Sequence, residues 1–315
     1  MTYNYAPELV EVVKMLPQGS LEDPIAAREY FEKAVAMLSP NIDTTGLSIK
    51  NLEVPGYENN PPVKIRIYSP ENMSANTPAL LHIHGGGYVI GSLETEHPIA
   101  VHHALKLGIT VVSVDYRLAP EHPYPAGLHD CYAALTWMHE QATHLNIDTN
   151  RIGLHGESAG AGLAAALTLM ARKLSGPGIC FQLLSIPELD DRLETTSATL
   201  FVDTPIWNRS MGIQSWQYYL GKNYQPGDAD VPVTAAPARA TDLTGLPPAL
   251  INTMEFDPLR DEGITYALRL LEAGVPVELH NYPGTFHGSV MFPADVSKRQ
   301  KQDTLSALKR GLGIN

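Results

Sequence analysis

One short segment around Ser158 constrains this 315-residue chain more than any other. An apolar stretch at residues 152–155 leads into a Gly-Glu-Ser-Ala-Gly run at 156–160, and an alanine-rich stretch with helical character follows. This pattern predicts a strand, a sharp turn and a helix, with the serine hydroxyl held clear of the backbone. The flanking glycines remove Cβ atoms that would collide where strand and helix cross. Ser158 is therefore a candidate nucleophile.

Strand-like and helix-like segments alternate along most of the chain. Strands are predicted at 48–54, 63–68, 79–84, 109–114, 151–155, 179–186, 249–254 and 275–281, and helical segments at 7–39, 97–107, 126–145, 158–174, 261–273 and 296–311. A Pro-, Asp- and Thr-rich interruption at 188–248 carries one further possible helix, at 205–220. Repeated strand–helix units predict an α/β fold with a mostly parallel sheet and helices on both faces. The carboxyl ends of the strands then carry the reactive loops.

Charge and composition exclude several classes of partner. The formal net charge of −12 disfavours binding to nucleic acid or to anionic membrane surfaces. Cys131 and Cys180 lie in apolar runs, without metal-ligand spacing or a disulfide framework. The first residues lack the basic and apolar pattern of a secretory signal, and no apolar run is long enough to span a bilayer. We therefore expect a cytoplasmic protein.

A glycine run follows the predicted strand at 79–84. It reads His84-Gly85-Gly86-Gly87, and glycines at this place let the chain approach a ligand and turn its N–H groups inward. We interpret the run as an oxyanion hole, to which the N–H of Ala159 adds a donor because it directly follows the candidate nucleophile. Each donor of this kind stabilises a transition state by about 2.7–4 kcal/mol.

Three carboxylates after the strand at 249–254 compete for the role of catalytic acid. Asp257 lies on the loop beyond the strand and precedes a proline that fixes the turn. Asp261 is better explained as an N-cap or first-turn acid of the following helix. Glu255 is nearer the end of the strand and fits a structural role. We therefore predict Asp257 as the acid.

His287 is the predicted base, chosen by position among twelve histidines. It lies on a glycine-flanked loop after the last strand, and the order Ser158, Asp257, His287 is the chain order of one class of serine hydrolases. The other histidines fall within predicted helices or strands or away from this sheet edge, where structural roles are usual.

The sequence predicts no metal site and no cofactor. The histidines at 139 and 144 resemble a zinc-protease helix, but they are five residues apart and would point to different faces. His82 and His84 share one strand face, yet the sequence offers no third ligand near them.

Five segments together resemble the hormone-sensitive-lipase-like family of α/β-hydrolase carboxylesterases, which includes microbial esterases and relatives of arylacetamide deacetylase. In order, they are residues 84–88, 115–126, 156–160, 257–262 and 286–288. His84, Gly85, Gly156, Glu157 and Gly160 are the supporting residues of the glycine-containing motifs. Glu157 stands where aspartate is usual in the family, and Ala161 where glycine is common. We expect the first departure to change hydrogen bonding around the site without abolishing activity.

The resemblance implies an eight-stranded sheet, a helical cap, and Gly86 and Gly87 as oxyanion donors beside Ala159. We therefore expect the chain to divide into four segments: a cap segment at 1–45, catalytic core at 46–187, a cap insertion at 188–230 and the rest of the core at 231–315. In the proline-rich segment 115–126 we expect Arg117 to pair with a carboxylate such as Glu121.

These features predict a serine carboxylesterase that acts on small-molecule esters through an acyl-enzyme. Short- to medium-chain acyl groups are favoured, because no long apolar lid is evident. Hydrolysis of amides (deacetylation) on the same triad remains open, as does a non-catalytic receptor of the same fold. The large apolar and aromatic residues of the cap are expected mainly in the cap's own core, with some lining the pocket. They are Trp207, Met211, Trp216, Tyr218, Tyr219, Tyr3 and Tyr5. A homodimer through the edge of the last strand is a weaker expectation.

Overall fold

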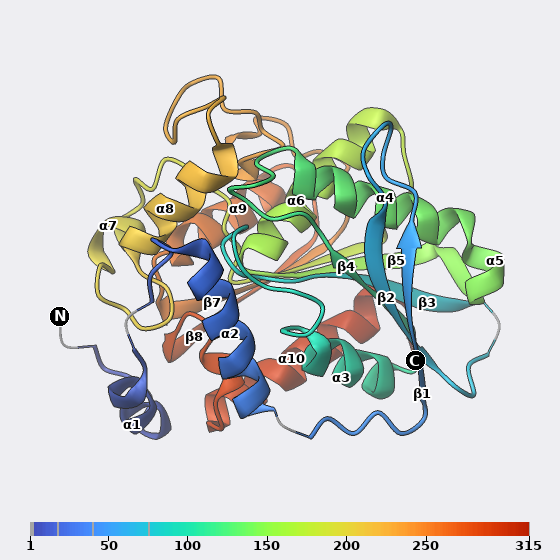
Figure 1. Cartoon of the computed structure of the whole chain (residues 1–315), viewed down its shortest axis with the longest axis horizontal. Helices are drawn as coiled ribbons and strands as arrows, with labels where there is room; N and C mark the ends of the chain where they lie inside the picture. Colours follow the sequence, from blue (N-terminus) through green and yellow to red (C-terminus); the bar gives the residue numbers. More distant parts are fainter. Residues whose placement is uncertain (1–2, 18, 40, 75, 315) are drawn as a thin grey trace.

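The computed structural model describes residues 3–17, 19–39, 41–74 and 76–314 (Figure 1). Its strands are β1 Leu47–Val54, β2 Val63–Pro70, β3 Thr77–Ile83, β4 Thr110–Asp115, β5 Ile147–Glu157, β6 Phe181–Ser185, β7 Ala249–Phe256 and β8 Val277–Phe286. Its α-helices are α1 Pro7–Met15, α2 Pro24–Leu38, α3 His97–Leu107, α4 Ala126–Glu140, α5 Ala142–Leu145, α6 Ala159–Leu174, α7 Thr196–Leu200, α8 Arg209–Leu220, α9 Arg260–Glu272 and α10 Asp295–Gly311.

All eight strands form one sheet in the order β1-β2-β4-β3-β5-β6-β7-β8. The pairs β1–β2 and β2–β4 are antiparallel, and every later pair is parallel. This confirms the predicted eight-stranded, mostly parallel sheet. The central strands β3, β4 and β6 are buried almost throughout, as expected where helices cover both faces.

Helices cover the two faces of the sheet unequally (Figure 1). The larger core joins one face to α4, α6 and α9, through residues such as Leu135, Leu167 and Leu270. The smaller core joins the other face to α3 and α10, through Val101 and Leu308. Each helix presents an apolar side to the sheet, so both layers are held by burial of apolar surface.

Local sequence explains where the structure departs from the predicted elements. The region 7–39 forms two helices, because Asp23 caps α2 by accepting hydrogen bonds from the N–H groups of Ile25 and Ala26. The predicted helix 126–145 divides at Gln141 into α4 and α5. The short helix α7 was not predicted; its cap, Thr195, accepts a hydrogen bond from the N–H of Ala198.

The N-terminal helices and α7–α8 lie toward the end of the sheet where β7 and β8 finish (Figure 1). Leu21, between α1 and α2, donates its N–H to the side chain of Gln214 on α8, so the N-terminal segment is in direct contact with α8. The division into a cap (1–45 and 188–230) and a core (46–187 and 231–315) stays a prediction. Among the described helices, none combines the length and apolar character needed to cross a membrane.

Candidate active site

Ser158 stands on a strained turn between β5 and α6. Its φ of 53° and ψ of −117° are rare for a residue with a side chain. The turn is possible because both flanking glycines meet backbone: a Cβ on Gly156 would lie 2.2 Å from the Gly160 oxygen, and one on Gly160 would lie 2.2 Å from the Ile83 oxygen. The crossing predicted from the sequence is therefore present.

The three predicted triad side chains meet at the carboxyl ends of β5, β7 and β8. Ser158 Oγ lies 3.0 Å from His287 Nε2, and His287 Nδ1 lies 2.7 Å from Asp257 Oδ2. The other oxygen of Asp257 accepts a hydrogen bond from the N–H of Leu259 at 2.9 Å, which orients the carboxylate. All three residues are buried. The arrangement is a hydroxyl, a base and an orienting acid in one line.

The competing carboxylates serve other contacts. Glu255 accepts a hydrogen bond from the N–H of Gly284 at 2.6 Å and so ties β7 to β8. Asp261 lies in the first turn of α9, pairs with Arg260 and accepts the N–H of Ser197 at the start of α7. Neither of them contacts His287 among the described residues.

The glycine run lies directly beside the candidate nucleophile. A Cβ on Gly85 would lie 3.4 Å from Ser158 Cβ. Gly86 and Gly87 have φ values of 117° and 56°, which favour glycine. Within the described chain, the N–H groups of Gly86, Gly87 and Ala159 donate no hydrogen bond to the protein. Three free donors therefore lie in the segments that flank Ser158.

His84 supports this loop from behind. Its Nδ1 donates to the oxygen of Gly85 at 2.8 Å, and its ring stacks on Tyr116 with centroids 4.0 Å apart. Tyr116 in turn donates its hydroxyl to the His84 oxygen at 3.0 Å. Burial lowers the pKa of His84 to about 4, so the ring is neutral at neutral pH. Its role in this structure is to hold the loop.

A serine and a glutamate that the sequence analysis missed also hold the glycine run. Ser215 Oγ, on α8, lies 2.9 Å from the oxygen of Gly87 and 2.9 Å from Glu188 Oε1. Glu188 is fully buried, and its backbone oxygen accepts a hydrogen bond from the hydroxyl of Tyr88. Burial raises the pKa of Glu188 to about 8. The sequence signal that could have identified Glu188 is its position just after β6, at the same edge of the sheet as the triad.

Trp207 brings the cap segment to the site. Its ring centroid lies 5.7 Å from that of His287, and a Cβ on Gly87 would lie 2.5 Å from Trp207 Cη2. Trp216 and Tyr219 are instead buried, and Tyr219 stacks on Tyr88 with centroids 3.8 Å apart. The aromatic residues of the cap thus divide between packing and the surroundings of the base.

The N-terminal tyrosines pack at the ends of β7 and β8. Tyr3 and Tyr5 both contact Phe256, with ring centroids 5.3 Å apart in each pair. Met211 lies against Gly19, and Tyr218 packs against the cluster that contains Trp207.

Glu157 connects the candidate nucleophile to a histidine cluster. Its Oε1 lies 3.0 Å from His155 Nε2, and burial raises its pKa to about 7. The prediction that no third ligand lies near His82 and His84 is wrong for His82, because His103 and His155 lie beside it. The register of β3 with β5 and the packing of α3 create this group, and neither could be read from spacing. His84 is not part of it.

The expected pairing of Arg117 with Glu121 is wrong. Arg117 donates to both oxygens of Asp130 on α4, at 2.8–3.1 Å. Glu121 pairs instead with Arg28 of α2, whose guanidinium also donates to the oxygen of Val89 beside the glycine run. Asp130 lies one helical turn inside α4, where its carboxylate also accepts the N–H of Arg117.

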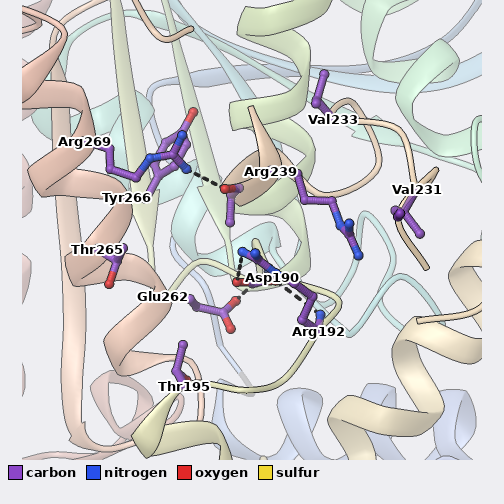
Figure 2. A pocket seen from close by; sticks show the side chains of 12 residues that line it. Asp190, Arg192, Thr195, Val231, Val233, Arg239, Glu262, Thr265, Tyr266 and Arg269 are labelled. Atoms are coloured by element: carbon purple, nitrogen blue, oxygen red, sulfur yellow. Dashed lines mark hydrogen bonds and ion pairs between the residues drawn. The ribbon is translucent and has the colours of Figure 1, made fainter. Parts of the chain in front are cut away.

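A separate cavity of about 480 Å³ lies between α9 and the segments around 190–195 and 229–239 (Figure 2). None of the residues that line it belongs to the triad. Its arginines already have partners: Arg192 pairs with Asp190, Arg239 pairs with Asp191, and Arg269 donates to backbone oxygens. Its arginine side chains are therefore already engaged in hydrogen bonds within the chain.

Comparisons with known proteins identify the family of this chain. The family model described as alpha/beta hydrolase fold matches residues 80–291. Carboxylesterase NlhH of Mycobacterium tuberculosis is 43% identical over 259 residues, which cover 82% of this chain and 81% of that protein. An arylesterase of Saccharolobus solfataricus is 35% identical over 298 residues, covering 90% of this chain and 88% of that protein.

Solved structures show the same relationship. A bacterial heroin esterase superposes with a TM-score of 0.96 at 50% identity, over 98% of both chains. A hyperthermophilic esterase from the archaeon Pyrobaculum calidifontis gives a TM-score of 0.90 at 32% identity, over 99% of both chains. The chain therefore belongs to the hormone-sensitive-lipase-like carboxylesterases of the α/β-hydrolase fold, and it is a carboxylic ester hydrolase.

Proposed function

We propose that this carboxylesterase works through Ser158, His287 and Asp257 in two acyl-transfer steps. His287 Nε2 takes the proton of Ser158 Oγ as the hydroxyl attacks the ester carbonyl, and Asp257 stabilises the imidazolium that forms. The N–H groups of Gly86, Gly87 and Ala159 bind the oxyanion. His287 then protonates the leaving alcohol, and a water molecule repeats the sequence on the acyl-enzyme.

The observation that carries this proposal is the line from Asp257 through His287 to Ser158, with hydrogen-bond distances of 2.7 and 3.0 Å. Both contacts are short enough for proton transfer without rearrangement of the side chains. The strained backbone of Ser158 supports it independently, since such strain concentrates at functional sites.

Two substitutions test the assignment with p-nitrophenyl butyrate as substrate. Ser158→Ala should abolish turnover. Asp257→Asn should lower kcat by roughly 10⁴-fold, because the amide favours the wrong imidazole tautomer. Asp261→Asn is the matched control, a carboxylate four residues away that does not contact His287, and it should retain activity within about tenfold. Retained turnover in Ser158→Ala would refute the proposal.

The substrates we propose are esters with short- to medium-chain acyl groups. Trp207 lies close to both His287 and Gly87, so its indole limits the space beside the reacting carbonyl. A series of p-nitrophenyl esters from acetate to palmitate should peak at or below the medium chain lengths. A maximum at the longest acyl groups contradicts this preference.

Amide hydrolysis on the same residues is the alternative reaction. Matched ester and anilide substrates with the same acyl group separate the two, and we expect the ester to give the higher kcat/KM. Labelling of Ser158 by a fluorophosphonate reports the nucleophile directly and excludes a purely receptor-like role.

A homodimer and a cytoplasmic location remain predictions. β8 lies at the edge of the sheet, where we propose that a second copy of the chain pairs with it outside Gly284, whose oxygen already accepts a hydrogen bond from the N–H of Ala6. Sedimentation of the full chain should show twice the monomer mass of 34.3 kDa if the edges pair. A monomer at all concentrations contradicts this.

A further inference from the structure

Three buried histidines from three elements gather behind the candidate nucleophile. His82 on β3 and His155 on β5 are direct register partners, and His103 of α3 packs against both. They are 0%, 1% and 3% exposed. One ring nitrogen from each lies within 4.8 Å of the other two. Ester hydrolysis by Ser158, Asp257 and His287 uses none of these rings.

The contacts that run from Glu96 through His82 and His155 to Glu157 cannot all be hydrogen bonds if both rings are neutral and both carboxyls are ionised. His82 Nε2 lies 3.1 Å from Glu96 Oε2, and His155 Nε2 lies 3.0 Å from Glu157 Oε1. A neutral imidazole has a single N–H, so a ring that donates from Nε2 keeps a bare lone pair on Nδ1. The two Nδ1 atoms face each other at 3.0 Å. The contact therefore needs either a metal ion between the rings or one proton more than the two that neutral rings carry, held by a ring or by Glu157.

The third ring favours the metal ion. Nδ1 of His103 is buried and has no hydrogen-bond partner among the described residues. An extra proton shared by His82 and His155 would leave that nitrogen unsatisfied, whereas a cation coordinated by all three rings would give each one a partner. Two of the rings also donate their other nitrogen to a carboxylate, as metal-bound histidines usually do.

We propose that His82, His103 and His155 form a buried site for a divalent transition-metal ion of the zinc type. Imidazole nitrogen suits Zn²⁺, Cu²⁺ and Ni²⁺ rather than Ca²⁺ or Mg²⁺. Zinc–nitrogen bonds of about 2.0–2.1 Å with tetrahedral angles set the nitrogens about 3.3 Å apart. The two facing nitrogens, now 3.0 Å apart, need to separate by a few tenths of an ångström, and ring nitrogens that lie up to 4.8 Å apart need to move closer. A small ligand such as water completes the coordination.

Charge balance agrees with a divalent ion. Glu96 and Glu157 are largely buried at the two ends of this line of contacts, and a divalent ion would hold both in the ionised form, with two negative charges that equal its own. Buried charges are tolerated when they are paired in this way. The ion joins α3 to the centre of the sheet, at a strand position three residues before Ser158, so its role is structural.

Zinc binding to the tag-free full-length chain tests the site. The protein is stripped with a chelator, equilibrated with zinc sulfate and dialysed against metal-free buffer. About one zinc per chain should remain, and Tm should rise by about 5 °C at a hundredfold excess of free zinc over Kd. His103→Gln should retain less than about a tenth of the metal and lose the rise in Tm.

His102→Gln is the matched control, because it removes the neighbouring histidine of the same helix, which is not in the cluster. It should bind zinc like the unmodified chain. If His103→Gln does not fold, cobalt(II) added to the unmodified chain decides: visible bands of tetrahedral nitrogen coordination support the site. Three results overturn it: no zinc after dialysis, equal zinc in the two variants, or no cobalt bands. An extra proton would then explain the contact between the Nδ1 atoms of His82 and His155.

Discussion

Glu188→Gln tests how the predicted cap insertion holds the glycine run at 85–87, our candidate oxyanion hole. Ser215 has one hydroxyl hydrogen but two oxygens at 2.9 Å, from Gly87 and Glu188. The Gly87 oxygen can only accept, so the hydroxyl hydrogen goes there and Glu188 must donate its own proton to Ser215 Oγ. Oε2 of Glu188 is buried without a hydrogen-bond partner in the described chain, which also fits a neutral carboxyl. The geometry therefore agrees with the raised pKa.

The magnitude follows from linkage. Folding raises the pKa of Glu188 from an ordinary 4.5 to about 8. At this site the folded state thus binds more protons, and the contribution of Glu188 to stability falls as pH rises from about 4.5 to about 8. At 1.36 kcal/mol per pKa unit, the cost is about 1 kcal/mol at pH 5 and about 5 kcal/mol at pH 9. Glutamine cannot ionise, and it keeps an N–H donor toward Ser215.

Urea unfolding at pH 5, 7 and 9 measures this effect. Relative to the unmodified chain, Glu188→Gln should gain about 4 kcal/mol of unfolding free energy between pH 5 and pH 9. Glu194→Gln, on the exposed surface of the same segment, is the control, with changes of about 0.5 kcal/mol or less. Activity should follow: above pH 8 the unmodified enzyme should lose kcat, and the variant should keep it. A difference in stability that is independent of pH would refute the reasoning.

Three further outcomes follow from the contacts. Gly160→Ala places a Cβ 2.2 Å from the Ile83 oxygen, so it should lower the free energy of unfolding by at least about 2 kcal/mol in urea. Arg28→Ala leaves Glu121 and a loop oxygen without a cation, and should lower both Tm and kcat, whereas the exposed Arg310→Ala should lower neither by much. Trp207→Ala should move the preferred acyl chain of p-nitrophenyl esters to greater length and lower kcat, and an unchanged profile contradicts a role beside His287.

The features that were predictable from the sequence are local. The turn at Ser158 is encoded by its own flanking glycines, and Asp257 and His287 each follow a strand directly. In a parallel sheet, strand ends share one edge, so chain position was enough to bring these residues together. The mostly parallel sheet was equally readable, because each strand–helix unit carries its own apolar pattern.

Contacts between distant segments were not predictable. Arg117 and Glu121 are near in sequence, yet Asp130 is the partner because the first turns of α4 present it to the guanidinium. His82 and His155 meet only because β3 and β5 pair in one particular register. A shift of that register by one residue would turn one of the rings to the other face of the sheet. No spacing in the sequence specifies this register.

On the proposed function, we expect the predicted cap insertion at 188–230 to contribute to catalysis as well as to substrate binding. Ser215 holds the oxygen of Gly87, and Trp207 lies against both Gly87 and His287. The same segment therefore restricts the acyl site and orients candidate oxyanion donors. Because oxyanion contacts act in the transition state, a change in these cap residues should alter kcat together with KM. Substitutions in this segment that change the preferred acyl chain should therefore also change the rate of the chemical step.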